Sequence, residues 1–230
     1  MNPSKFLVST PWDAQLFGIN TFEIVVDSEN KLSQVIKQVF SEKNTGHYTV
    51  KVNPLLSKKL LHDYGFYYCD TLIEPYCNTE SFREFTKQDI SLSESVSLEK
   101  FLEICHGAFV HGRFHRDFNL DKNLADTRYN SWLKQLYEQQ RVWGLMYQDK
   151  LAGFWGFSRN KILLHALSQQ YRGKGMAKYF WSLACQELFN QGYTELISSI
   201  SAANVAVLNL YSSLGFKFRN PVDIYHLLLE

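Results

Sequence analysis

The sequence predicts an α/β fold, and three observations support this prediction. Apolar runs of strand length alternate with stretches whose apolar residues recur at helical spacing. Two of the helical stretches adjoin glycine turns, at Gly173 and Gly175 and at Gly215. With 230 residues, of which 45% are hydrophobic and 15% aromatic, the chain can bury one large core or two modest ones.

Residues 1–85 are predicted to form a smaller N-terminal α/β unit. Strands are expected at 6–8, 21–26 and 48–52, with a helix at 32–40 whose apolar residues share one face. Residues 53–73 and 204–224 also share an order of asparagine, helix, Gly-Phe and strand. The first unit is therefore interpreted as a partial second copy that binds no cofactor, with chance similarity as the alternative.

The polar, serine-rich stretch 81–97 is expected to separate this unit from a second domain, 86–230. Helices are predicted near 98–104 and 124–138. Two strands, 142–147 and 151–157, follow and are joined by a turn at 148–150.

The bulk composition excludes several classes of function. A net charge of +1 gives no general attraction to nucleic acid. No apolar run is long enough to span a membrane and no leader is evident, so a cytoplasmic protein without membrane contact is expected.

The four cysteines show neither a CxxC pair nor zinc-ligand spacing, so neither a metal nor a disulfide is expected; these are Cys69, Cys77, Cys105 and Cys185. Cys185 lies on the apolar face of a predicted helix and is interpreted as a packing residue.

Residues 162–189 read as a strand, a glycine turn and a helix. The turn has the pattern Gln170-x-x-Gly173-x-Gly175, with Arg172 and Lys174 interleaved. Glycines let backbone N–H groups approach an anion, and a helix start adds partial positive charge, so a phosphate is expected here. The patterns GxxxxGK[ST] and GxGxxG are absent. By itself the turn could be a plain helix entry.

A second motif follows: Asn204, Tyr211 and Gly215-Phe216, leading into a strand at 224–229. Together the two motifs resemble the GCN5-related N-acetyltransferase (GNAT) family. The resemblance implies a mixed, mostly antiparallel sheet flanked by helices, and acetyl-CoA as co-substrate. It places acetyl-CoA at Leu167, Ser168, Gln170, Arg172, Gly173, Lys174, Gly175, Met176, Ala177 and Asn204.

The family reaction needs a base for the amine, a donor for the thioester carbonyl and an acid for the thiolate. The resemblance puts Tyr211 near the cofactor sulfur, as the acid. Backbone N–H groups at the end of strand 164–168 are expected to polarise the carbonyl. The base stays open among a water chain and four side chains: His165, His111, His115 and Asp117.

Further residues resemble the bacterial TDP-fucosamine N-acetyltransferases: Arg113-Phe114, Asp117, Tyr129 with Trp132, and an opening that runs from Trp12-Asp13 through Phe17-Gly18 to Asn20. This implies an acceptor amine on a nucleotide-linked, dTDP-type amino sugar. The substrate residues would be Arg113, Phe114, Asp117 and His165. Alternatives are a different small amine, a protein N-terminus, or a CoA-binding module without catalysis. A homodimer through a sheet edge is also conceivable.

Overall fold

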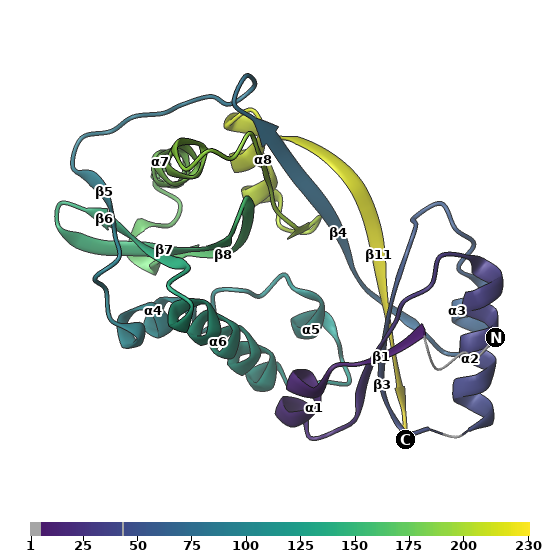
Figure 1. The fold of residues 1–230 in the computed structure, drawn as a ribbon. Helices are drawn as coiled ribbons and strands as arrows, with labels where there is room; N and C mark the ends of the chain where they lie inside the picture. Colours follow the sequence, from purple (N-terminus) through teal and green to yellow (C-terminus); the bar gives the residue numbers. More distant parts are fainter. Residues whose placement is uncertain (1–5, 43) are drawn as a thin grey trace. The chain divides into compact units, whose positions relative to one another are not determined.

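The computed structural model describes residues 6–42 and 44–230 (Figure 1). The chain divides into two compact units. The first contains the described residues up to Leu72 together with His111–Arg128 and Pro221–Glu230, and the second contains Ile73–Val110 and Tyr129–Asn220. Two later stretches thus belong to the same unit as the N-terminal strands. The predicted domain boundary itself stays a prediction.

The first unit is a small α/β layer. Its strand order is β1-β2-β3-β11-β4, in which β2 and β3 are parallel and β3 and β11 antiparallel. Its elements, with β4, α6 and β11 divided between the units, are β1 (Leu7–Ser9), α1 (Pro11–Phe17), β2 (Thr21–Ile24), α2 (Glu29–Ser41), β3 (Gly46–Val52), α3 (Lys59–Asp63), β4 (Tyr67–Asn78), α5 (Arg113–Arg116), α6 (Lys122–Glu138) and β11 (Lys217–Leu229).

Side-chain alternation gives this sheet two different faces. Tyr48 and Val50 of β3 pack against Leu32 and Ile36 of α2 in an apolar core. His47 is on the opposite face of β3, and its strand carries it into a polar environment. The core face therefore stabilises the unit and the other face carries the chemistry.

The second unit has the strand order β11-β4-β9-β8-β7-β6-β5, and β10 pairs with β4. Strands β5 to β8 are antiparallel neighbours. The elements that it adds are β5 (Ile90–Ser93), α4 (Leu98–Cys105), β6 (Val142–Tyr147), β7 (Lys150–Ser158), β8 (Lys161–Leu167), η2 (Gln169–Tyr171), α7 (Ala177–Asn190), β9 (Glu195–Ile197), β10 (Ile200–Ser201) and α8 (Val205–Ser213).

Helices cover both faces of the sheet in this unit (Figure 1). Trp155 of β7 belongs to the core formed with α7 and α8, where Phe180 and Cys185 are fully buried. Phe154 points to the opposite face and packs with α4 and α6. The prediction that Cys185 is a packing residue is confirmed.

The expected fold class is confirmed, and the long predicted elements are present. The polar stretch at 81–97 contains a strand that the sequence analysis did not predict, because Ile90–Ser93 forms β5 and pairs with β6. Ile90 and Leu92 alternate with serines and pack on the core. This alternation has the period of two of a strand, but the polar composition of the stretch makes it hard to recognise in the sequence. Among the helices of the described residues, none has the length and apolar content needed to cross a bilayer.

Candidate active site

Strands β8 and β9 pair over a very short stretch and then diverge. Among the described residues their parallel register consists of the pair Lys161 and Ile197, whereas β8 runs on to Leu167 beside β7. The Ser168 N–H donates to the Ala152 carbonyl at 2.8 Å. Because successive amides of a strand point to opposite edges, the Leu167 N–H points to the edge from which β9 has diverged. A backbone donor is thus available at the strand end where the resemblance implied one.

The glycine turn that follows has the conformation the sequence anticipated. Gly173 and Gly175 have φ of 72° and 67°, in the left-handed region that favours glycine. No side chain caps the start of α7, behind Met176. The first N–H groups of a helix have no partner within it, so these donors, next to the exposed Lys174, suit an anion such as a pyrophosphate.

Arg172 ties this turn to β8, because its Nε donates to the Leu167 carbonyl at 2.7 Å. Arg172 as a whole is exposed. The Ser168 hydroxyl oxygen is buried and has no hydrogen-bond partner in the described part of the chain. Gln170 is exposed and Ala177 opens the helix. Nine of the ten residues predicted for acetyl-CoA thus fall within one continuous strand-turn-helix segment.

The tenth, Asn204, lies at the N-terminus of α8 and its side chain accepts a hydrogen bond from Val207 N at 3.3 Å. In this structure it acts as a helix cap, and its contact with acetyl-CoA stays a prediction. Helix α8 ends before Gly215, which has a φ of 88°. The Phe216 N–H then donates to the Tyr211 carbonyl at 3.0 Å, which fixes the position of Tyr211 on the last turn.

The Tyr211 side chain is fully buried, and its hydroxyl lies 3.0 Å from Nε2 of His165 on β8. Burial raises the pKa of Tyr211, and it lowers the pKa of His165 to about 4. At neutral pH the phenol is therefore protonated and the imidazole is neutral. Sequence reasoning named both residues for separate roles but did not predict that they touch.

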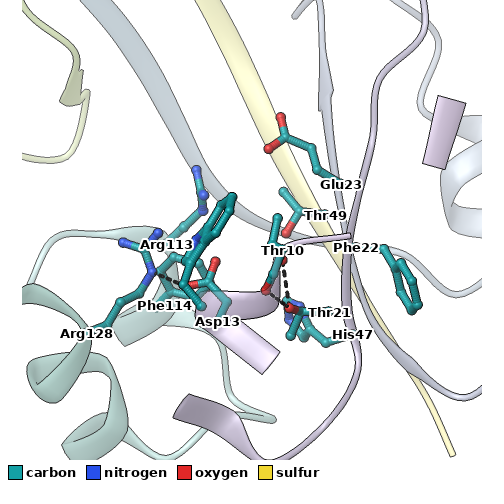
Figure 2. Close-up of a pocket in the computed structure, with 11 residues that line it drawn as sticks. Thr10, Asp13, Thr21, Phe22, Glu23, His47, Thr49, Arg113, Phe114 and Arg128 are labelled. Atoms are coloured by element: carbon teal, nitrogen blue, oxygen red, sulfur yellow. Dashed lines mark hydrogen bonds and ion pairs between the residues drawn. The ribbon is translucent and has the colours of Figure 1, made fainter. Parts of the chain in front are cut away.

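Three other predicted substrate residues lie in the first unit. Arg113 and Phe114 belong to α5 and line a small pocket with a cavity volume of about 50 Å³ (Figure 2). The guanidinium carbons of Arg113 and Arg128 lie 4.7 and 4.4 Å from the centre of the Phe114 ring. Asp13 accepts from Arg128 Nε at 2.6 Å. Sequence reasoning missed Arg128, which lies well apart from Arg113 in the chain.

The remaining residue, Asp117, has no exposed surface. Its Oδ2 accepts from His47 Nε2 at 2.8 Å and from His226 Nδ1 at 2.7 Å, and its Oδ1 accepts from the Tyr67 hydroxyl at 2.9 Å and from the Asn119 N–H at 2.9 Å. The carboxylate is thus bound by groups of its own chain. Its direct contact with a substrate, or its use as the base, stays a prediction.

The pKa of Asp117 reflects this cluster. Burial opposes its ionisation, but the hydrogen bonds from His226 and His47 outweigh burial and lower the pKa. Burial lowers the pKa of His226 to about 4. The cluster therefore holds one buried carboxylate between two imidazole N–H donors.

Two histidines and a carboxylate form a set that can bind a metal ion. In this structure, however, the ring nitrogens lie 2.7 and 2.8 Å from the carboxylate oxygen, which are hydrogen-bond distances. Ligands of a tetrahedral Zn²⁺ with bonds of about 2.0 Å lie roughly 3.3 Å apart. The observed arrangement is that of a hydrogen-bonded cluster.

Comparisons with known proteins identify the segment that carries the glycine turn and the buried pair. Residues 110–216 match the model of the Acetyltransferase (GNAT) family. This segment of the chain is therefore similar to a GNAT-family acetyltransferase domain. The match supports an acetyltransferase, and acetyl-CoA is the co-substrate of the GNAT family. A search of curated proteins found no match.

Solved structures share the fold at low sequence identity. A GCN5-related N-acetyltransferase from Sphaerobacter thermophilus aligns with a TM-score of 0.66 and 11% identity over 92% of this chain and 73% of its own. A GNAT-family acetyltransferase from Colwellia psychrerythraea gives 0.58 and 14% over 90% and 76%. A tandem GNAT protein from the clavulanic acid biosynthesis pathway gives 0.54 and 10% over 91% and 75%. These similarities concern the fold and leave the acceptor open.

Proposed function

We propose that this GNAT domain transfers an acetyl group from acetyl-CoA to the amino group of a nucleotide-linked amino sugar, by direct attack of the amine. The observation that carries the donor half is the edge of β8, where β9 diverges beside an uncapped helix start. That edge offers backbone donors to the pantetheine and the pyrophosphate, which are the polar parts of CoA. The Leu167 N–H is the proposed donor to the thioester carbonyl.

The acceptor half rests on the first unit. Arg113 and Arg128 flank the Phe114 ring in a pocket that also contains the hydroxyls of Thr10 and Thr21, which lie 2.6 Å apart. Asp13 offsets the charge of Arg128. A guanidinium such as that of Arg113 forms charge-assisted hydrogen bonds to phosphate, so this pocket suits the diphosphate of a nucleotide sugar.

The proposal is tested by a thioester-cleavage assay with three groups of acceptors: dTDP-linked amino sugars, unrelated small amines, and peptides with a free N-terminus. Turnover with the first group supports the proposal. Turnover with another group alone would reject the nucleotide sugar. Calorimetry with acetyl-CoA covers the remaining outcomes, since binding without turnover would indicate a CoA-binding module and lack of binding would reject the donor half.

The Arg113→Ala variant tests the acceptor site directly. Loss of a charge-assisted contact should raise the KM for the acceptor about tenfold, equivalent to about 1.4 kcal/mol, and leave the Kd for acetyl-CoA unchanged. Arg159→Ala, which removes an exposed guanidinium from the turn between β7 and β8, is the matched control. Equal KM values in the two variants would remove Arg113 from the acceptor site.

A further inference from the structure

The Tyr211 hydroxyl has no direct route to the exterior in this structure. The residue has 0% exposed surface, and its ring packs against Phe216 with centroids 4.8 Å apart. Its hydroxyl is turned toward His165 Nε2 at 3.0 Å. His165 itself is only partly buried. The imidazole is a hydrogen-bond partner of this phenol, and the side chains of Ser198 and Trp181 also lie close to it.

Packing holds the His165 ring in this position. His165 is the cross-strand partner of Trp155, and the two rings stack with centroids 5.4 Å apart at 25°. The Trp181 ring meets His165 edge-on at 4.8 Å and 75°. Two large indoles on two sides restrict rotation of the imidazole, so Nε2 stays on the phenol. Nδ1 is the other ring nitrogen of this partly buried residue.

His165 also lies close to the part of β8 that the proposed function uses. It precedes Leu167 by two residues, so its own backbone N–H points to the same diverging edge of the strand. The residue that contacts the phenol therefore lies two positions before the strand end proposed for the thioester.

We propose that Tyr211 acts through His165, which carries the proton between the buried hydroxyl and the reacting atoms. The inference rests on the proposed function. Tyr211 donates its hydrogen to Nε2 and the neutral imidazole carries its own hydrogen on Nδ1. His165 is then the residue that touches the substrate, and Tyr211 supplies the proton behind it.

The proton transfers balance. The amine nitrogen forms a bond to the acetyl carbon, the carbon–sulfur bond breaks, and the thiolate takes the hydrogen of His165 Nδ1. The Tyr211 hydrogen moves to Nε2 in the same step. The amine nitrogen then gives up its extra proton to Nδ1, and the hydrogen on Nε2 returns to the phenolate. The site ends in its starting state, with an amide and a CoA thiol as products.

The test is a double-mutant cycle of Tyr211→Phe and His165→Gln, with kcat as the readout. A glutamine keeps a polar group near the phenol but has no second ring nitrogen to pass a proton. Each single variant should lose roughly 10²-fold in kcat, typical of a positioned acid, and the double variant should lose no more than either single one. Tyr193→Phe and His106→Gln are the matched controls, and they should keep wild-type rates.

Two further measurements separate proton transfer from structure. The Kd for acetyl-CoA should stay at the wild-type value in all variants. An acetyl thioester with a more acidic thiol, which needs no proton on departure, should restore most of the lost rate in both single variants.

The remaining outcomes each count against a definite claim. If the two losses multiply, or if His165→Gln is as fast as wild type, Tyr211 acts without His165 and the inference is overturned. If the more acidic donor restores neither variant, the pair is structural and the inference is likewise overturned. If the wild type cleaves acetyl-CoA with no acceptor, the proposed function fails and the relay fails with it.

Discussion

His226 Nδ1 donates to Asp117 Oδ2 across 2.7 Å, joining residues that are 109 positions apart in the chain. Both side chains have no exposed surface. A second donor, His47 on β3, meets the same oxygen. One ionised carboxylate therefore links the loop after α5 to β3 and β11. It does so on the face of these two strands that points away from α2.

Replacing Asp117 by asparagine should destabilise the protein strongly. The substitution removes the charge that both imidazole N–H groups face and introduces an amide with donors of its own, so buried donors lose their acceptor. We expect the free energy of unfolding to fall by about 3–5 kcal/mol, measured by urea denaturation. Asp63→Asn is the control, because its pair with Lys59 is exposed and should matter by less than about 1 kcal/mol. Equal effects would show that the Asp117 cluster does not hold the fold.

Acid should weaken the fold through His226. Its pKa is about 4 in the folded protein against 6.5 for a free histidine, so the unfolded chain binds more protons between these values. The contribution is complete above pH 6.5 and is lost as the pH falls toward 4, by about 2 kcal/mol between pH 7 and pH 5.

His165 adds a loss of the same sign, because its folded pKa is also lowered to about 4. The free energy of unfolding of the wild type and of His226→Gln should be measured at both pH values. The variant should lose less on acidification than the wild type. A pH dependence that does not change on removal of His226 would contradict the assignment.

Substituting Gly175 by valine should weaken the binding of acetyl-CoA. A β-branched residue is strained at a φ of 67°, so the turn would move and its backbone donors with it. We expect a Kd by calorimetry at least about tenfold higher, at little cost in stability. Gly192→Val places the same strain at a φ of 96° just after α7, and it should leave the Kd unchanged. If Gly175→Val binds as tightly as Gly192→Val, the turn is not the phosphate site.

Substituting Gly215 by alanine should impair folding rather than binding alone. A Cβ at this position would lie 2.0 Å from the Ser81 carbonyl oxygen, which is backbone and cannot easily give way. We expect a loss of more than about 2 kcal/mol in the free energy of unfolding, since overpacking adds to the strain of a φ of 88°. Gly192→Ala is the control, because its Cβ would lie in open space and the substitution would add only the backbone strain. A thermal-denaturation curve for Gly215→Ala that matches that of Gly192→Ala would refute the steric argument.

The strand, glycine turn and helix at 162–189 could be predicted from the sequence because their signals are local. Gly173, Gly175 and the apolar spacing of α7 lie within one continuous stretch, so the turn follows from neighbouring residues. The glycine after α8 has the same character, since Gly215 ends a helix by its own conformation. Such features do not depend on the rest of the chain.

The polar clusters were not foreseen, because they depend on which distant segments meet. Nothing near Asp117 in the sequence indicates that His47 and His226 will enclose it. In the same way, the contact between His165 and Tyr211 depends on how α8 packs on the sheet. A resemblance to one group of acetyltransferases suggested a site role for Asp117, whereas its complete burial follows from the packing of three separate elements.

The place of β11 between β3 and β4 bears on how the polypeptide is made. Leu227 pairs in register with Tyr48, so the centre of the first sheet is completed by a strand that is synthesised well after β3. Until then the facing edges of β3 and β4 have no strand between them, and an open edge invites pairing with other chains. Long-range pairing of this kind also folds slowly. The first sheet therefore cannot close until β11 has been synthesised, an interval in which chaperone protection would have its greatest effect.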